Sequence, residues 1–451
     1  KPIGYFQILV LPIELGARPY AMDCTNDAAC GWHQTCNARH ECEVLHLFAN
    51  PLADICMGAL SFVIAGISLA AGVGGGGMFV PLLMLFLAFD ARIATALSQA
   101  MLLGGALAAF LYNATHSHPH VKGRPIIDYQ LACLMGPCLM SGAQVGSLIH
   151  AVAPPAVLAF LLCVVLIDAA RKGFQNVKKI MAKEKEAASH GAPLKKNEDS
   201  EEEEEEEPSD KEEVVELTRD AKCKLFFIWL FCLCVTFCKG RLVEICDWKW
   251  WCLVALATIV LGVFGIRFGQ KVGSEAPVDS ECLDFRELGS EIVKWSFIAG
   301  FIAAICGIGG GMVMGPKLVG LNVPSPVSSA TTATTLLVLS SSIALVYICR
   351  SIAPLDYSIY LSIMTSTGAF TGKVVIGRWV KRTGKESVLV WALAGITISS
   401  TILMGGLGIY RIYKLGWEAF MLGQLCDDDV GHKLFRKHNH NHNHSESFHH
   451  R

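Results

Sequence analysis

Two glycine-rich runs carry the residue types best suited to hold a small anion within this chain. Residues 72–77 read GVGGGG and residues 307–311 read GIGGG. Neither run is followed by the Lys-Ser/Thr pair of a phosphate-binding loop, which excludes a nucleotide site of that kind. Each run instead predicts a broken helix, because glycine relaxes the backbone and a new half-helix exposes unpaired amide hydrogens at its positive end. Close helix packing is the alternative, and the candidate anion-binding residues are Gly74, Gly75, Gly76, Gly309, Gly310 and Gly311.

Further candidate ligands follow the runs. Four polar residues in the next apolar segments could donate to anion oxygens: Ser98, Gln99, Thr334 and Thr335. Their alternative role is a hydrogen bond to a carbonyl of their own helix. Lys317 and Lys373 lie within apolar stretches of the second half. A cation there is a functional hypothesis by default, with snorkelling to the membrane surface as the alternative.

Cysteines near the start of the chain predict an oxidising compartment. Four of them lie six residues apart in a polar stretch: Cys24, Cys30, Cys36 and Cys42. Zinc sites prefer closer pairs, so two disulfides are predicted, with metal binding or free thiols as alternatives. The segment up to about residue 50 is then extracytoplasmic, and residues 1–21 are a candidate remnant of a secretory signal. The other 14 cysteines lie mostly in apolar runs, where a thiol behaves as a small hydrophobe.

Histidine clusters are weaker candidates. Residues 116–120 read HSHPH, and histidine alternates with asparagine at 438–444. Neither segment offers the supporting hydrogen bonds that fix metal-ligating histidines, so no metal and no cofactor is predicted. Asn113-Ala114-Thr115 fits a glycosylation acceptor, but the predicted topology below places it in the cytosol.

Composition identifies the class of protein. Of 451 residues 52% are hydrophobic and 17% are charged, against roughly a quarter charged in soluble domains. The apolar residues gather into stretches of about 20, the length that crosses roughly 30 Å of hydrocarbon. Basic residues flank these stretches without interleaved aromatics, which argues against nucleic acid as a partner. The predicted fold is an all-α polytopic membrane protein in a lipid bilayer.

The apolar stretches fall into two matching sets. They lie at about 53–72, 75–88, 91–112, 128–150, 154–170, 224–240, 249–267, 292–307, 309–320, 326–349, 357–379 and 387–411. The first glycine run and Pro81 match the second run and Pro316; further matches are Ala94-Thr95 and Ser98 with Ala330-Thr331 and Thr334, Asp128-Tyr129 with Asp356-Tyr357, and Gly142-Ala143-x-x-Gly146 with Gly368-Ala369-x-x-Gly372. Two halves of five elements joined by a linking pair have opposite orientations, the inverted repeat of secondary transporters.

This organisation predicts six regions and an orientation. The regions are 1–50, the cysteine-rich lumenal segment with any signal remnant; 53–172, the first repeat; 173–222, an acidic disordered cytoplasmic loop containing seven consecutive glutamates; 224–267, the linking pair; 292–411, the second repeat; and 412–451, a histidine-rich tail. Basic loops near residues 122–124, 171–179 and 381–385 favour the cytoplasmic side. Counting each element as one crossing agrees with an extracytoplasmic N-terminus and puts the C-terminus outside. Basic residues from Arg411 onwards favour the inside, so the side of the C-terminus stays open.

With these motifs the chain resembles the TauE/SafE family of sulfite exporters. The similarity rests on a glycine-rich break followed by a proline in each half, the Ala-Thr-x-x-Ser/Thr element after it, and the charged loop between the halves, over about residues 53–411. It implies export of sulfite or a related small sulfur-containing organic anion, with no enzyme activity. The coupling partner, a proton or another ion, and the oligomeric state stay open.

Two other function classes remain. One is a membrane thiol oxidoreductase that uses Cys133 and Cys138 or the cysteines at 232–238, although no C-x-x-C motif supports it. The other is a lumenal receptor or scaffold anchored by the helices, which would not need duplicated glycine breaks.

Overall fold

The computed structural model is a helical protein built from the elements that the hydrophobic pattern predicts. It describes residues 34–36, 42–70, 72, 74–89, 91–116, 125–189, 208–243, 247–275, 285–321, 323, 325–349, 352–383 and 387–415. The α-helices are α1 (Pro51–Ala70), α2 (Gly76–Phe86), α3 (Ala91–Ala114), α4 (Tyr129–Val152), α5 (Pro155–Ser189), α6 (Pro208–Phe237), α7 (Trp248–Glu275), α8 (Phe285–Cys306), α9 (Gly311–Gly320), α10 (Ser325–Cys349), α11 (Leu355–Thr383) and α12 (Ser387–Leu415). Each predicted apolar segment corresponds to one of them, which confirms the fold class.

Helix lengths separate full spans from half-helices. Within the described residues, eight helices are long and apolar enough to cross a membrane, namely α1, α3, α4, α6, α7, α8, α10 and α11. By contrast, α2 has 11 residues and α9 has 10. At 1.5 Å per residue they cover only about half of a roughly 30 Å hydrocarbon core. The chain is therefore a multi-pass membrane protein with one short helix in each half.

The chain divides into two compact units, Lys1–Leu45 with Gln424–Arg451, and His46–Gly423. The described part of the first unit is an antiparallel pair, β1 (Gln34–Cys36) and β2 (Cys42–Val44). Cys36 is disulfide-bonded. Cys24, Cys30 and the side chain of Cys42 lie outside the described residues, so the pairing of the four cysteines stays a prediction.

In the second unit the two halves are intertwined. The most extensive packing joins α4 of the first half to α8 of the second, and α11 of the second to α1 of the first. A Cβ on Gly142 would overlap the carbonyl oxygen of Phe297, and a Cβ on Gly368 would overlap that of Phe62. The two contacts occupy matching places in the repeat. The duplicated Gly-Ala-x-x-Gly motif therefore lets two helix backbones approach closely.

Contacts along α3 and α10 are those of an inverted repeat. Gly105 of α3 contacts the end of α1, and Ser329, near the start of α10, contacts Gly72 just beyond that end. Leu336, about two turns later on α10, contacts Gly74. Leu102 of α3 contacts Gly74 too, but it comes before Gly105 in the chain. Going from the end of α1 towards Gly74 therefore means moving forward along α10 and backward along α3. The helix α10 thus runs antiparallel to its counterpart α3, as opposite orientations require.

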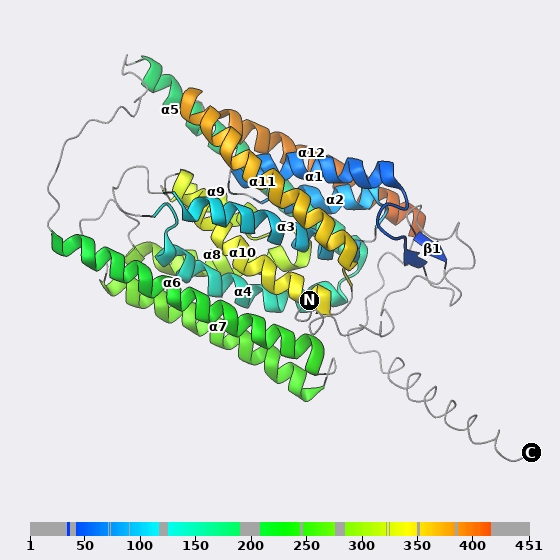
Figure 1. Ribbon diagram of the computed structural model, residues 1–451, viewed down its shortest axis with the longest axis horizontal. Helices are drawn as coiled ribbons and strands as arrows, with labels where there is room; N and C mark the ends of the chain where they lie inside the picture. Colours follow the sequence, from blue (N-terminus) through cyan, green and yellow to red (C-terminus); the bar gives the residue numbers. More distant parts are fainter. Residues whose placement is uncertain are drawn as a thin grey trace, which may run out of the picture. The chain divides into compact units, whose positions relative to one another are not determined.

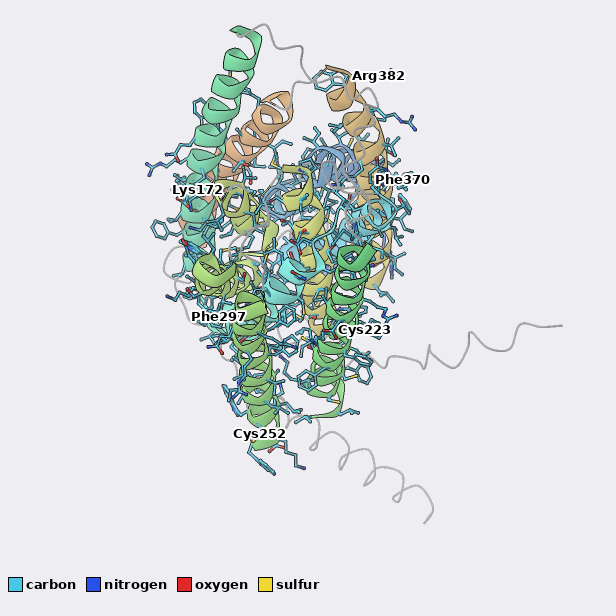
Figure 2. All side chains as sticks on the ribbon, turned by 90° about the vertical axis from the view of Figure 1, so that its left-hand side faces the viewer. Lys172, Cys223, Cys252, Phe297, Phe370 and Arg382 are labelled. Atoms are coloured by element: carbon cyan, nitrogen blue, oxygen red, sulfur yellow. The ribbon has the colours of Figure 1, made fainter. Side chains whose placement is uncertain are left out.

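The linking pair forms one edge of the body. The helices α6 and α7 pack against α4, α8 and α10, whereas α1, α5, α11 and α12 lie at the opposite edge (Figure 1). Large apolar side chains on the outer helices are exposed, among them Phe227 and Ile402, as well as Phe297 and Phe370, which are labelled in Figure 2. This much exposed apolar surface suits contact with lipid.

The region predicted as an acidic loop, 173–222, is helical at both ends. The helix α5 continues to Ser189, and α6 already begins at Pro208. The sequence before Ser189 is rich in Lys, Glu and Ala, which are strong helix formers, and proline is favoured at the first position of a helix. Charge density alone therefore predicted too long a loop, and 190–207 lies outside the described residues.

The end of α3 bears on the sequon and the first histidine cluster. Asn113 is only 3% exposed, which removes it from the surface where glycosylation takes place. The Nδ1 atom of His116 lies 2.8 Å from the carbonyl oxygen of Tyr112, and the two rings stack. His118 and His120 lie outside the described residues. In the part of the chain that is described, no three His, Cys, Asp or Glu side chains are grouped to hold a metal.

Candidate functional site

The two glycine runs break the backbone in the same way. Gly72 and Gly74 both have a φ of 74°, and Gly307 and Gly309 have φ of 72° and 78°. Residues with a Cβ rarely adopt these values. The positive φ thus falls on the first and third residues of each run, whereas Gly75 has a φ of −85° and Gly310 of −63°, values that any residue adopts.

A half-helix begins directly after each break. Gly75 is the N-cap of α2 and Gly310 that of α9, and neither cap makes a side-chain hydrogen bond to its helix. A Cβ on Gly76 would overlap the carbonyl group of Ile308, so the start of α2 lies against the second break. Two uncapped helix N-termini are therefore adjacent. Amide hydrogens and helix dipoles at such ends favour an anion.

Each break is held by a helix of the other half. Gly72 fits against Ser329 of α10, whereas Gly307 fits against Thr95 of α3, where a Cβ would lie 2.7 Å from the threonine Cγ2. The Ser329 hydroxyl donates to the carbonyl oxygen of Ala70 at 3.2 Å. The Ser98 hydroxyl donates to that of Gly307 at 2.8 Å. Both breaks consequently lie at the interface between the halves.

These contacts correct the register of the repeat in α3 and α10. Thr95 and Ser329 occupy equivalent places, and so do Leu102 and Leu336, which both contact Gly74 and Gly309. This register differs by two residues from the sequence match, which paired Ser98 with Thr334. The match was misled because both helices contain several small hydroxyl residues in succession.

Gln99 is the predicted site residue that most needs a ligand. Its side chain is 0% exposed, and neither its Oε1 nor its Nε2 has a hydrogen-bond partner among the described residues. It lies four residues after Thr95 and three before Leu102, on the α3 face that contacts Gly307 and Gly309. A buried amide without partners costs about 1–3 kcal/mol. A polar ligand at the second break would remove that penalty.

Lys373 brings a positive charge to the first break. Its side chain on α11 is buried, and its Nζ donates to the Ser329 hydroxyl at 3.0 Å. Ser329 in turn contacts Gly72 and bonds Ala70, so the lysine is connected to the first break through one side chain. A buried ammonium is costly unless a negative charge compensates it. The geometry therefore suits an anion beside this break.

Comparison with known proteins decides the family. A family model described as "Sulfite exporter TauE/SafE" matches residues 57–201. "Sulfite exporter TauE/SafE family protein 3" of Arabidopsis thaliana is 32% identical over 387 residues, which cover 80% of this chain and 79% of the relative. The chain belongs to the TauE/SafE family. Two further Arabidopsis thaliana members, proteins 5 and 2, are 25% and 26% identical over 85% and 81% of this chain and 87% and 86% of their own lengths. No solved structure matches it.

Three predicted site residues of this TauE/SafE chain have partners elsewhere. The Lys317 Nζ lies 2.6 Å from Glu291 and 5.0 Å from the Trp295 ring centre, and both partners belong to α8. The Lys317 side chain is 29% exposed, so it is not the buried cation that the apolar run suggested. The hydroxyls of Thr334 and Thr335 donate to carbonyls of their own helix. For the two threonines the observed bond is the alternative role, whereas Lys317 forms an ion pair that the sequence analysis did not consider.

Sequence reasoning missed three buried ionisable residues of this TauE/SafE chain, Asp54, His150 and Lys239. Asp54, in the first turn of α1, is 1% exposed and accepts hydrogen bonds from the Phe48 amide and the Tyr357 hydroxyl. His150, near the end of α4, is 4% exposed. An ionisable side chain in or beside an apolar run was a usable signal for all three.

Proposed function

We propose that this TauE/SafE-family chain is a secondary transporter that exports sulfite or a related small sulfur-containing anion. The anion binds where the N-termini of α2 and α9 meet, between the two halves. The substrate class follows the printed names of the relatives. The structural observation that carries the proposal is Gln99, because a buried amide without partners beside an uncapped helix N-terminus is a group that awaits a polar ligand.

Each part of the proposed site suits an oxyanion. The helix N-termini supply amide hydrogens and partial positive charge. Gln99 supplies a donor and an acceptor at the second break, and Lys373 supplies a full charge at the first. Sulfite is compact, so one ion can interact with both breaks where they adjoin. Rocking of the halves about this site gives alternating access.

The proposed orientation keeps the N-terminal segment extracytoplasmic and the basic loops in the cytoplasm. Because α1 and α3 both lie along α11 in the same direction, they begin on the same side of the membrane, and α2 returns the chain to that side. Whether the chain crosses the membrane twice or turns back within it between α1 and α3, α3 begins on the side where α1 began. The positive-inside assignment of the loops is therefore retained.

Sulfite binding by Gln99→Leu tests the site. Leucine fills a similar volume but cannot hydrogen-bond, so sulfite affinity should fall about ten- to hundredfold, the range for one hydrogen bond to a charged group. Calorimetry on detergent-purified protein and efflux from proteoliposomes measure the loss. The melting temperature should not fall, because the substitution removes a buried amide that has no recorded partner.

Asn113→Leu is the matched control. Asn113 is a second buried amide on α3, about four turns from Gln99, and its Nδ2 also has no recorded partner among the described residues. Its replacement should leave sulfite affinity unchanged. Equal losses in both variants would mean that Gln99 acts on the helix and not on the anion.

A further inference from the structure

We infer that His150 is the proton-binding residue that couples sulfite movement to proton movement, an inference that rests on the proposed transport function. Three features carry it: the hydrogen bonding of the ring, its place beside the second break, and the lack of an equivalent group at the first break.

The hydrogen bonding of His150 leaves one ring nitrogen available. Its Nδ1 lies 2.8 Å from the carbonyl oxygen of Ile305. A carbonyl only accepts, so Nδ1 carries the hydrogen in this arrangement, and Nε2 then has a lone pair. Nε2 is buried and has no hydrogen-bond partner among the described residues. Protonation at Nε2 therefore disrupts no recorded interaction.

The ring is attached to the backbone that enters the second break. Ile305 is the next-to-last residue of α8, and Gly307, with its φ of 72°, follows two residues later. The carbonyl end of a helix attracts positive charge. An imidazolium at this point gains both from the end of α8 and from an anion in the adjacent break. Anion and proton thus stabilise each other.

Two of the other groups around His150 are cations. From α3, the Arg92 guanidinium donates to the carbonyl of Ala151 at 3.4 Å. From α10, the Tyr347 ring lies 6.2 Å from the imidazole, and Cys306 of α8 adjoins Ile305. From the π-helical turn η2 (Cys238–Leu242), Lys239 bonds Gln144, six residues before His150 on α4. In this described surrounding there is no carboxylate, so a bound anion supplies the compensating negative charge.

The first break has no imidazole at the place equivalent to His150. In the register set by Gly142 and Gly368, Ile376 occupies the place of His150 and cannot bind a proton. The carbonyl equivalent to that of Ile305 belongs to Ala70 and is bonded by Ser329, the partner of Lys373. The titratable group at the first break is Lys373, which reaches the Ala70 carbonyl through Ser329, whereas at the second break an imidazole bonds the equivalent carbonyl directly. In each cycle the Nε2–H bond forms with a proton from water on one side as the anion binds, and it breaks to return that proton to water on the other side.

His150→Asn separates coupling from transport. The Asn amide can keep the hydrogen bond to Ile305, but it has no titratable nitrogen. In proteoliposomes with equal, saturating sulfite on both sides, exchange of labelled sulfite should continue, but its half-saturating sulfite concentration should rise because no imidazolium stabilises the anion. Proton movement that accompanies a sulfite gradient, followed with a pH-sensitive dye, should fall at least tenfold. A variant that moves protons with sulfite in the wild-type ratio would overturn the inference.

His116→Asn is the matched control, because His116 also has its Nδ1 2.8 Å from a backbone carbonyl but is not buried. It should keep the wild-type ratio of protons to sulfite, and loss of coupling in both variants would overturn the role of His150.

A second measurement tests the inference if His150→Asn abolishes exchange. Calorimetry in buffers of different ionisation enthalpy measures the proton uptake that accompanies sulfite binding. The variant should take up fewer protons than wild type at the same pH, and equal uptake contradicts the proposal. Wild-type protein that exchanges no sulfite would instead remove the proposed function itself.

Discussion

The two glycine breaks have the same backbone but different polar surroundings. Before the first break, the carbonyl of Ala70 accepts a hydrogen bond from Ser329, which is bonded by Lys373. Before the second break, the equivalent carbonyl of Ile305 is bonded by His150. The first break therefore has a lysine and the second has an imidazole, with the amide of Gln99 nearby.

This difference separates what the fold requires from what the substrate requires. Both halves need positive φ and close backbone contact, so both keep glycine at the same places. A single small anion needs one set of ligands, so the side chains around the two breaks are free to diverge. Substitution of a break glycine should therefore lower stability at either break. Substitution of a polar side chain should change sulfite affinity in a way that differs between the two breaks.

Alanine at Gly72 should cause the largest loss. Its Cβ would overlap the Cα of Ser329, and the φ of 74° is unfavourable for alanine. These effects together lower the free energy of unfolding by about 2–5 kcal/mol. Gly307→Ala should lose less, because its Cβ first meets the Thr95 side chain. Thermal unfolding in detergent measures both, with Gly405→Ala as the control, since nothing lies within 4 Å of a Cβ there. Wild-type stability of Gly72→Ala would contradict the described break.

Removal of the buried lysine should affect binding and not stability. Lys373→Met eliminates a charge at the first break, so sulfite affinity should fall about ten- to hundredfold. The melting temperature should hold or rise, because replacing a buried charge with an apolar residue is often stabilising. Calorimetry and thermal unfolding separate the two effects.

Lys317→Met is the comparison for Lys373→Met. Lys317 pairs with Glu291 where both side chains are partly exposed, and such pairs contribute about 0–1 kcal/mol to stability. The sulfite affinity of the Lys317→Met variant should stay within about twofold of wild type. The reverse ranking of the two lysines would move the anion away from the first break.

Loss of the Ser98 hydroxyl should have the smallest measurable effect. It donates across the interface to Gly307, so Ser98→Ala should lower the free energy of unfolding by about 0.5–1.5 kcal/mol. Thr334→Ala should change it less, because the Thr334 hydroxyl bonds a carbonyl within α10 that the helix already uses. Thermal unfolding that ranks Thr334 above Ser98 would support the register of the sequence match over that of the structure.

The sequence determined the features that depend on local chemistry and length. Apolar stretches near the width of a membrane predicted the helices, and glycine in matching places predicted both breaks, because backbone freedom is a property of the residue itself. Gln99 was also identified as a candidate site residue. The duplicated Gly-Ala-x-x-Gly motif was visible for the same reason.

Only the tertiary structure decided which polar residues meet the breaks. Lys317 and Lys373 lie in similar apolar sequence, but one pairs with Glu291 and the other reaches Ser329, because α9 and α11 have different neighbours. The register of α3 against α10 depends on which residues fill the space beside each glycine, and a run of small hydroxyl residues allows more than one match. His150 acquires its place from the carbonyl of Ile305, which is 155 residues away in the chain. Such contacts arise from packing between the intertwined halves, which no local pattern encodes.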